Sequence, residues 1–213
     1  MKVIPSINCE DEACVRNKIA MLRPWLPEGS LVHGDVTDGV FSKHATWNHP
    51  QGWSSLGAPF ALEVHLMVEH PLDYADDWFA AGARRLLVHV ETLTPESFHA
   101  LSQLAEQYKG SLMLTSKPET PCSDLEPWIE RFSAFQVLAV TPGEAGQTFL
   151  PIAIEKIRFL REAAPDATIE VDGGMNRETA HEVKSAGADT IVSAHYIFES
   201  SDPKKAFEDL RNI

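Results

Sequence analysis

The sequence predicts an α/β fold, a single (β/α)8 barrel of the TIM-barrel type over residues 1–213, on three observations. Eight apolar segments of strand length alternate with amphipathic segments of helix length. The strand-length segments are almost continuously apolar, as expected for parallel strands covered on both faces. No linker, charge block or low-complexity run divides the chain. A closed barrel is favoured over a doubly wound sheet, because no GxGxxG run follows the first strand.

The elements follow in order along the chain. The predicted strands are Val3–Ile7, Leu31–Val36, Phe60–Val68, Leu86–Glu91, Ser111–Thr115, Ala134–Val140, Thr168–Asp172 and Asp189–Ala194. Helical patterns cover residues 73–83, 94–108, 150–164 and 176–188. Thr94 before Pro95 predicts a capped helix start, and Asn176 with Thr179 predicts another. The segment Ser42–Pro59 is predicted to be a structured loop with a short helix, in which Trp47 and Trp53 are candidates for a lid.

The composition narrows the class of protein. The net charge is −13, with 44% apolar and 23% charged residues, which argues against partners such as nucleic acids or anionic membranes. There is no apolar signal segment and no run of eighteen apolar residues, so we expect neither secretion nor a membrane span. Cys9, Cys14 and Cys122 are odd in number and form no CxxC pair. We therefore expect reduced thiols, no disulfide and a cytoplasmic protein.

Polar residues gather at the carboxyl ends of the predicted strands, where barrel active sites lie. They are Ser6, His33, Asp35, His65, His89, Glu91, Asp172, Ser193 and His195. Because side chains alternate along a strand, His33 and Asp35 point the same way, as do Glu63 and His65. Imidazoles and carboxylates that converge at one mouth suit Zn²⁺, Fe²⁺, Mn²⁺ or Co²⁺. Each residue alone is better explained by a local hydrogen bond, but four of them at the strand ends of one barrel favour a metal site. A hydrogen-bonded core pair is expected for His89 and Glu91.

Five motifs in this order resemble those of the ribulose-phosphate 3-epimerase family, over nearly the whole chain. They are HGDVTDGVF (33–41), EVHLMVEHP (63–71), VTPGEAGQTF (140–149), IEVDGGMN (169–176) and AGADTIVSAHYIF (186–198). The resemblance implies an isomerase of carbohydrate metabolism, in the pentose phosphate pathway, with one divalent metal ion as cofactor. It also implies four metal ligands, two of which are the catalytic carboxylates. The four ligands are His33, Asp35, His65 and Asp172, and the catalytic pair is Asp35 and Asp172.

The substrate-binding positions come from the same resemblance. Ser6 would orient a carboxylate or the substrate, and Met175 would line the pocket. The other implied substrate-binding residues are His65, Met67, Gly143, Gly146, Gln147, Gly173, Gly174, Ala194 and His195. Epimerisation beside a ketone removes a C–H proton on one face and returns one on the other, so two carboxylates serve as base and acid. Lyases of the same barrel group carry a lysine in a D-x-K-x-x-D run, and the corresponding run here, DVTDG, has none.

The phosphate-binding segments depart from the family pattern. Ala194 and His195 replace a Gly-Ser pair, Ala145 replaces a glycine, and Glu144 replaces an aromatic residue. A methyl group limits close approach of a phosphate to the backbone. Three interpretations stay open: His195 donates to phosphate, the pocket takes a different or absent phosphate, or His195 points away. Thr37, where the family has methionine, makes the pocket wall more polar if it points inward.

The predicted function is a metal-dependent 3-epimerase that interconverts D-ribulose 5-phosphate and D-xylulose 5-phosphate, or a close ketose phosphate. One alternative is the same chemistry on another ketose with different or no phosphate. A second alternative is a barrel that binds a sugar phosphate without turnover, although such a module has no need for both carboxylates. Resembling proteins often form homo-oligomers. The identity of the metal, the ketose and the oligomeric state stay open at this point.

Overall fold

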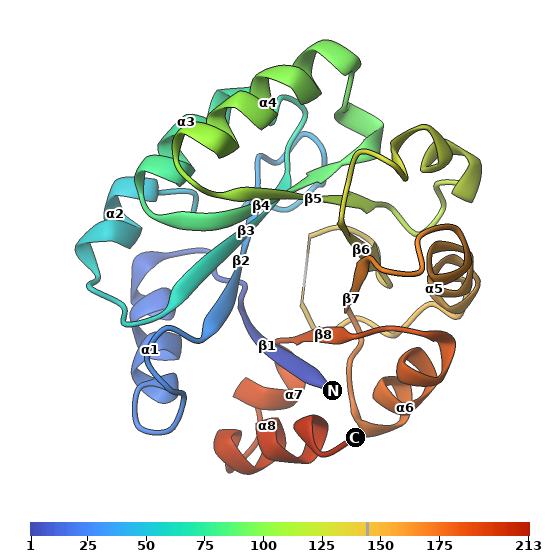
Figure 1. Ribbon diagram of the computed structural model, residues 1–213. Helices are drawn as coiled ribbons and strands as arrows, with labels where there is room; N and C mark the ends of the chain where they lie inside the picture. Colours follow the sequence, from blue (N-terminus) through green and yellow to red (C-terminus); the bar gives the residue numbers. More distant parts are fainter. Residues whose placement is uncertain (144) are drawn as a thin grey trace.

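The computed structural model describes residues 1–143 and 145–213. Eight parallel strands run in the order β1 to β8, and β8 pairs with β1 to close the barrel. Figure 1 shows the strands as an inner ring with helices around it. The strands are β1 Lys2–Ile7, β2 Leu31–Thr37, β3 Ala61–Met67, β4 Ala83–His89, β5 Ser111–Ser116, β6 Ala134–Leu138, β7 Thr168–Asp172 and β8 Thr190–Ser193. The predicted (β/α)8 barrel and its single domain are confirmed.

The helices occupy most of the crossover connections. They are α1 Glu12–Leu22, α2 Pro50–Ser55, α3 Leu72–Ala80, α4 Pro95–Gln107, α5 Ile152–Ala163, α6 Arg177–Ala186, α7 His195–Phe198 and α8 Pro203–Arg211. Between β5 and β6 the chain forms two 3-10 helices, η2 Cys122–Asp124 and η3 Glu126–Trp128, in place of an α-helix. Both predicted helix starts are confirmed, because Thr94 with Ser97 and Asn176 with Thr179 each form a capping box.

Several predicted strand boundaries are off by one or two residues, such as that of β6, which ends at Leu138 and not at Val140, and the fourth strand departs most. The fourth strand begins at Ala83, before the predicted Leu86, and Glu91 lies beyond it in η1 Val90–Thr92. A search for apolar runs misses the start of this strand, because Arg84 and Arg85 are charged. Arg85 belongs in the strand because its guanidinium binds the buried carboxylates of Glu63 and Glu170 inside the barrel.

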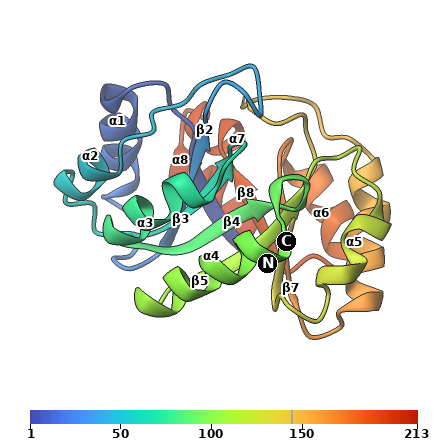
Figure 2. The same cartoon turned by 90° about the horizontal axis from the view of Figure 1, so that it is seen from above.

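Two packed regions follow from the alternation of side chains along the strands. One set of side chains, such as Val64, Leu86 and Ile169, is fully buried in the hydrophobic core with residues of the helices. The other set faces the barrel axis and is unusually polar. It includes His33, Glu63, His65, Gln136 and Glu170, all 2% exposed or less. Figure 2 shows the loops after β2 and β6 at the same end of the barrel.

The expectation of three reduced cysteines is wrong for two of them. Cys9 and Cys14 form a disulfide, and Cys122 is free. The first turn of α1, capped by Asp11, folds Cys14 back toward the end of β1, which places the two Cα atoms 5.7 Å apart. That separation is typical of a disulfide. An odd count of cysteines therefore does not exclude one local pair.

None of the helices among the described residues has the length and apolar character to cross a membrane. The two ends of the chain meet at one side of the barrel (Figure 1), where the amino terminus donates a hydrogen bond to the carbonyl of Arg211.

Candidate active site

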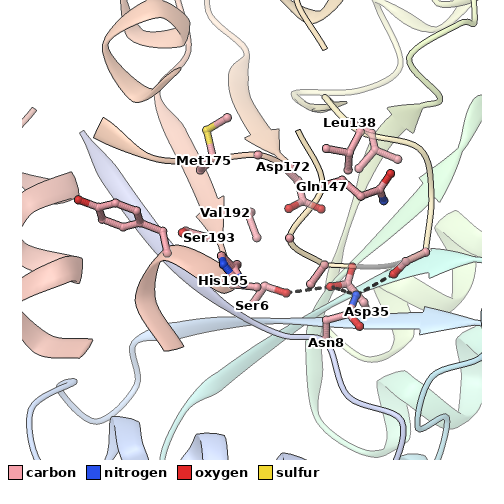
Figure 3. A pocket seen from close by; sticks show the side chains of 18 of the residues that line it. Ser6, Asn8, Asp35, Leu138, Gln147, Asp172, Met175, Val192, Ser193 and His195 are labelled. Carbon is pink, nitrogen blue, oxygen red and sulfur yellow. Dashed lines mark hydrogen bonds between the residues drawn. The ribbon is translucent and has the colours of Figure 1, made fainter. Parts of the chain in front are cut away.

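A cavity of about 180 Å³ opens at the carboxyl ends of the strands, where barrel active sites lie. Nearly all of the predicted substrate-binding residues line it. These are Ser6, Met67, Gly143, Gly146, Gln147, Gly173, Gly174, Ala194 and His195, together with Met175. His65 does not line this cavity and is fully buried. Asp35 and Asp172 complete the wall, entering from β2 and β7 toward the same space (Figure 3).

Four side chains converge at this wall. The Oδ1 atom of Asp35 lies 3.3 Å from both Nε2 of His33 and Nδ1 of His65. The Oδ2 atom of Asp172 lies 3.9 Å and 3.8 Å from the same two nitrogens. One ligand atom from each residue lies within 4.8 Å of all the others. The structure therefore brings together the four residues that the sequence proposed as ligands.

Each of the two histidines turns one ring nitrogen toward this cluster. Nδ1 of His33 is 2.8 Å from Oε1 of Glu63, and Nε2 of His65 is 2.8 Å from Nε2 of His89. The other nitrogen of each ring, Nε2 of His33 and Nδ1 of His65, is buried with no hydrogen-bond partner among the described residues. Buried polar atoms without partners are rare and call for an explanation. Two imidazole nitrogens and two carboxylate oxygens fit a divalent transition-metal ion, so the residues suit the implied cofactor.

Asp35 is held in a fixed orientation. Its Oδ2 atom accepts hydrogen bonds from the Ser6 hydroxyl at 2.8 Å and from the Asn8 amide at 3.2 Å. The same amide donates to the carbonyl of Gly143 at 2.9 Å, as Figure 3 shows for this wall of the cavity. Oδ1 is therefore left to face the cluster. Sequence reasoning missed Asn8, although it follows β1 two residues after Ser6 and so shares its side of the strand.

The two carboxylates differ in acidity. Burial alone would raise the pKa of Asp35, but the nearby imidazoles of His33 and His65 outweigh it and hold that pKa well below its usual value. For Asp172, burial and then the charge of Asp35 raise the pKa to about 8. At neutral pH one carboxylate is thus ionised while its neighbour carries a proton. Environments that separate two carboxyl pKa values in this way are typical of acid/base pairs.

The histidines differ in the same way. Burial lowers the pKa of His65 to about 4, so its ring is neutral. For His33, burial acts to lower the pKa, but the charge of Asp35 and the charge and hydrogen bond of Glu63 outweigh it and raise the pKa well above its usual value. A cation bound at Nε2 of His33 would compete with that proton.

A buried ionic network lies behind the cluster, and the sequence did not predict it. Glu63 binds His33 through one oxygen and Arg85 through the other. Arg85 also donates to Glu170 at 2.9 Å, and Gln136 donates to Glu170 at 3.2 Å. Burial, with the charge of Glu63, raises the pKa of Glu170 to about 7. The sequence contained one indication of this network. Glu63 and Glu170 are each two residues from a candidate ligand, His65 and Asp172, and so lie on the same inward face of their strands.

Two glycines that line the cavity lie close to other residues. A Cβ atom on Gly174 would lie 2.5 Å from the amide nitrogen of Phe149, and its φ of +68° is in the left-handed region. A Cβ on Gly146 would lie 3.4 Å from Nδ1 of His195. His195 lines the cavity beside Gly146, and its exposed side chain also borders the surface near α8. Ala145 also lines the cavity, whereas Glu144 lies outside the described residues.

The tryptophan lid is a wrong prediction. Trp53 is 7% exposed and belongs to the hydrophobic core, and Trp47 packs against that core. Neither residue lines the cavity. The loop Ser42–Pro59 instead contacts the wall of the cavity from outside, where the side chains of Ser42 and His44 lie against Gly143. Thr37 is 2% exposed and does not line the cavity, so it does not make that wall polar.

Comparisons with known proteins identify the family and the fold. The family model described as the Ribulose-phosphate 3 epimerase family matches residues 2–198. A ribulose-phosphate 3-epimerase of Schizosaccharomyces pombe is 32% identical over 99% of this chain and 92% of its own length. One from Bacillus subtilis is 32% identical, over 99% of this chain and 98% of its own. A 3-hexulose-6-phosphate synthase structure from Salmonella typhimurium shares the fold, with TM-score 0.76 and 13% identity over 100% of this chain and 97% of that one.

Proposed function

The chain belongs to the ribulose-phosphate 3-epimerase family of isomerases, and on this premise we propose that it interconverts D-ribulose 5-phosphate and D-xylulose 5-phosphate with the help of one divalent metal ion. The observation that carries the proposal is the meeting of Asp35 and Asp172 at one cavity, beside two imidazole nitrogens that have no hydrogen-bond partner among the described residues. This role agrees with a place in the pentose phosphate pathway.

The metal would be held by His33 Nε2, Asp35 Oδ1, His65 Nδ1 and Asp172 Oδ2, which are the atoms that converge. Zinc, iron, manganese and cobalt all suit this donor set. When bound, the ion would stabilise the negative charge that develops on the substrate's oxygens as an enediolate forms. The remaining steps belong to residues of the chain.

The proton transfers are assigned to the two carboxylates. Asp35, ionised and oriented by Ser6 and Asn8, takes the proton from C3 on one face of the substrate. Asp172, which has the higher pKa of the two carboxylates, returns a proton to the opposite face. The two roles exchange in the reverse direction, since each carboxylate is then in the other protonation state. Met67, Leu138 and Met175 line the cavity with apolar surface and limit water near the reacting carbon.

The phosphate is assigned to the end of the cavity that Gly173, Gly174 and His195 line. Glycine permits close approach of backbone N–H groups to phosphate oxygens. The imidazole of His195 would donate one hydrogen bond in place of the hydroxyl that the family has at this position. Ala194 lines the cavity with a methyl group where the family has a glycine. This substitution favours one alternative: the same epimerisation on a ketose that lacks the phosphate or carries it elsewhere.

The deciding experiment is a 3-epimerase assay on D-ribulose 5-phosphate, with free D-ribulose and D-xylulose measured in parallel. We expect turnover of the phosphate ester with loss of C3 deuterium to solvent. Turnover of the free ketoses at a higher kcat/KM would replace the first substrate by the alternative. No exchange at C3 of any ketose would reject the epimerase proposal.

The proposal also covers features that lie outside the site. We place the enzyme in the cytoplasm, where the Cys9–Cys14 disulfide would be exposed to reductants. Residues 1–213 would act as one catalytic domain, assembled as a homo-oligomer. Gel filtration with light scattering on the full chain measures the last of these.

A further inference from the structure

We propose that His89 and Glu91 are positioning residues that determine which nitrogen of His65 is free to bind the metal. The inference rests on the proposed function, in which His65 Nδ1 is a ligand. Neither residue lines the cavity or contacts the carboxylate pair, so they act through His65 alone.

The three side chains form a chain of hydrogen bonds that leads away from the cluster. His65 Nε2 lies 2.8 Å from His89 Nε2, and His89 Nδ1 lies 3.0 Å from Oε2 of Glu91. Both imidazoles are fully buried, while the Glu91 side chain is 21% exposed. These two hydrogen bonds therefore connect His65 on β3, a candidate metal ligand, through His89 on β4 to the partly exposed carboxylate of Glu91.

The carboxylate of Glu91, at the end of this series of hydrogen bonds, accepts hydrogen bonds and cannot donate them. Oε1 of Glu91 accepts from the backbone N–H of Lys117 at 2.8 Å and from the hydroxyl of Thr120. A backbone N–H is an obligate donor, so it holds the carboxylate in this orientation. An ionised carboxylate has only acceptor sites, and Oε2 is therefore available to His89 as an acceptor.

Because Glu91 can only accept, it determines which nitrogen of His89 and which nitrogen of His65 donates. Because Glu91 accepts, the proton of neutral His89 lies on Nδ1, and its Nε2 carries a lone pair. That lone pair needs a donor, so the proton of neutral His65 lies on Nε2. Nδ1 of His65 is then left with a lone pair that points at Asp35 and Asp172, and it is one of the buried atoms without a partner. Reversing one bond would put a proton where the metal binds.

The rings are also held in place. The planes of His65 and His89 are 16° apart with centroids separated by 5.0 Å, which allows a bond close to the plane of both rings. Phe41 covers His89 at a centroid distance of 4.5 Å, and the ammonium of Lys117 lies 3.8 Å above Phe41. His33 offers an internal comparison, because its Nδ1 is bound directly by Glu63 with no second histidine between them.

The experiment uses two variant pairs of the full-length protein. Glu91→Gln replaces one acceptor oxygen by a donor, and Thr120→Val is its control, because it removes a neighbour of Glu91 and leaves the bond to His89 intact. His89→Phe removes both ring nitrogens, and His89→Gln keeps an acceptor for His65 and a donor for Glu91. Circular dichroism and thermal unfolding establish that each variant is folded.

The first readout is the affinity for zinc or cobalt alone, measured by competition with a chelator. Loss of a partner behind a metal-bound histidine typically weakens metal affinity by about 10–100-fold. We expect a loss of that size in Glu91→Gln and His89→Phe, partial recovery in His89→Gln, and wild-type affinity in Thr120→Val. Wild-type affinity in Glu91→Gln and His89→Phe would overturn the inference, and so would an equal loss in all four variants, which would indicate a structural role.

The second readout is the tautomer of His65, from long-range ¹⁵N–¹H correlation spectra of histidine-labelled protein treated with chelator. We expect the proton on Nε2 in the wild type and a shift toward Nδ1 in Glu91→Gln. A proton on Nδ1 in the wild type would overturn the inference. If the wild type binds no metal but keeps the Nε2 proton, the metal part of the proposed function falls while the hydrogen-bond chain stands.

Discussion

Asp35 on β2 and Asp172 on β7 bring carboxylate oxygens to within 4.8 Å of each other at the mouth of the barrel. Their environments shift the two carboxyl pKa values in opposite directions. One oxygen of Asp35 accepts hydrogen bonds from Ser6 and Asn8, whereas Asp172 accepts no side-chain hydrogen bond from the described residues. The pKa of Asp35 is well below its usual value and that of Asp172 is about 8. This difference underlies the predictions that follow.

Removing either carboxylate should stop epimerisation. In Asp35→Asn and in Asp172→Asn we expect kcat to fall by about 10²–10⁴-fold, the usual contribution of a positioned acid or base. Any residual C3 exchange should be confined to one epimer, and to a different one in each variant, because each keeps the base for one face. Asp166→Asn, at an exposed position, is the matched control. Deuterium exchange followed by NMR makes the measurement, and wild-type epimerisation in either variant would contradict the mechanism.

The raised pKa of Asp172 predicts a pH-dependent stability of the chelator-treated protein. The folded chain holds this proton up to about pH 8, whereas the unfolded chain releases it near the ordinary pKa of 3.8. Stability contributed by this group is therefore lost as the pH rises from about 4 to 8, at about 1.4 kcal/mol for each unit of pKa difference. We expect Asp172→Asn to be more stable than wild type by a few kcal/mol at pH 8 and equal to it at pH 4. Urea denaturation at both values tests this, and a stability difference that does not change with pH would refute it.

Metal binding should be stoichiometric and should stabilise the fold. We expect one zinc, cobalt, manganese or iron ion per chain by elemental analysis, with epimerisation lost on chelation and restored by metal. A ligand that binds only the folded state stabilises it by about 2.7 kcal/mol at 100 times its dissociation constant. The rise in the unfolding midpoint should disappear in His65→Asn. A midpoint that stays constant as metal is added to the wild type would remove the ion from the site.

His195 should matter only for phosphorylated substrates. If its ring donates to the phosphate, His195→Ala should raise KM for the ketose phosphate by about tenfold or more, the value of a hydrogen bond to a charged group. The KM for a free ketose, if it is turned over, should not change. Tyr196→Phe, a neighbour that lines the same cavity, serves as the control. An unchanged KM for the phosphate ester would leave His195 without this role.

The Cys9–Cys14 disulfide should stabilise the loop that carries Asn8. The bond closes a short loop, with a sequence separation of 5, for which the chain-entropy model gives about 2 kcal/mol. We expect a reducing agent to lower the free energy of unfolding by that amount, Cys14→Ser to remove the dependence on reductant, and Cys122→Ser to retain it. Thiol titration of the unfolded protein without reductant should find one free thiol. Three free thiols, with no effect of reductant, would mean that the disulfide does not form.

Much of the architecture was predictable because it depends on local periodicity. Continuous apolar runs separated by amphipathic segments are enough to identify eight strands, and alternation along a strand is enough to put His33 and Asp35 on one side. The caps at Thr94 and Asn176 were predictable for the same reason, since a cap involves neighbours in sequence. The motifs added the positions of His65 and Asp172.

What the sequence by itself determined, then, is which side chains point into the barrel and at which end. Only the tertiary structure decided which atoms meet there: the bond from His65 to His89, the ion pairs of Arg85, the amide of Asn8 on Asp35, and the burial of Trp53 instead of a lid. The physical reason is that these contacts join different strands and depend on the register with which the sheet closes. The opposite pKa shifts of Asp35 and Asp172 follow from that register, because each reflects the burial and the neighbours that the closed barrel supplies.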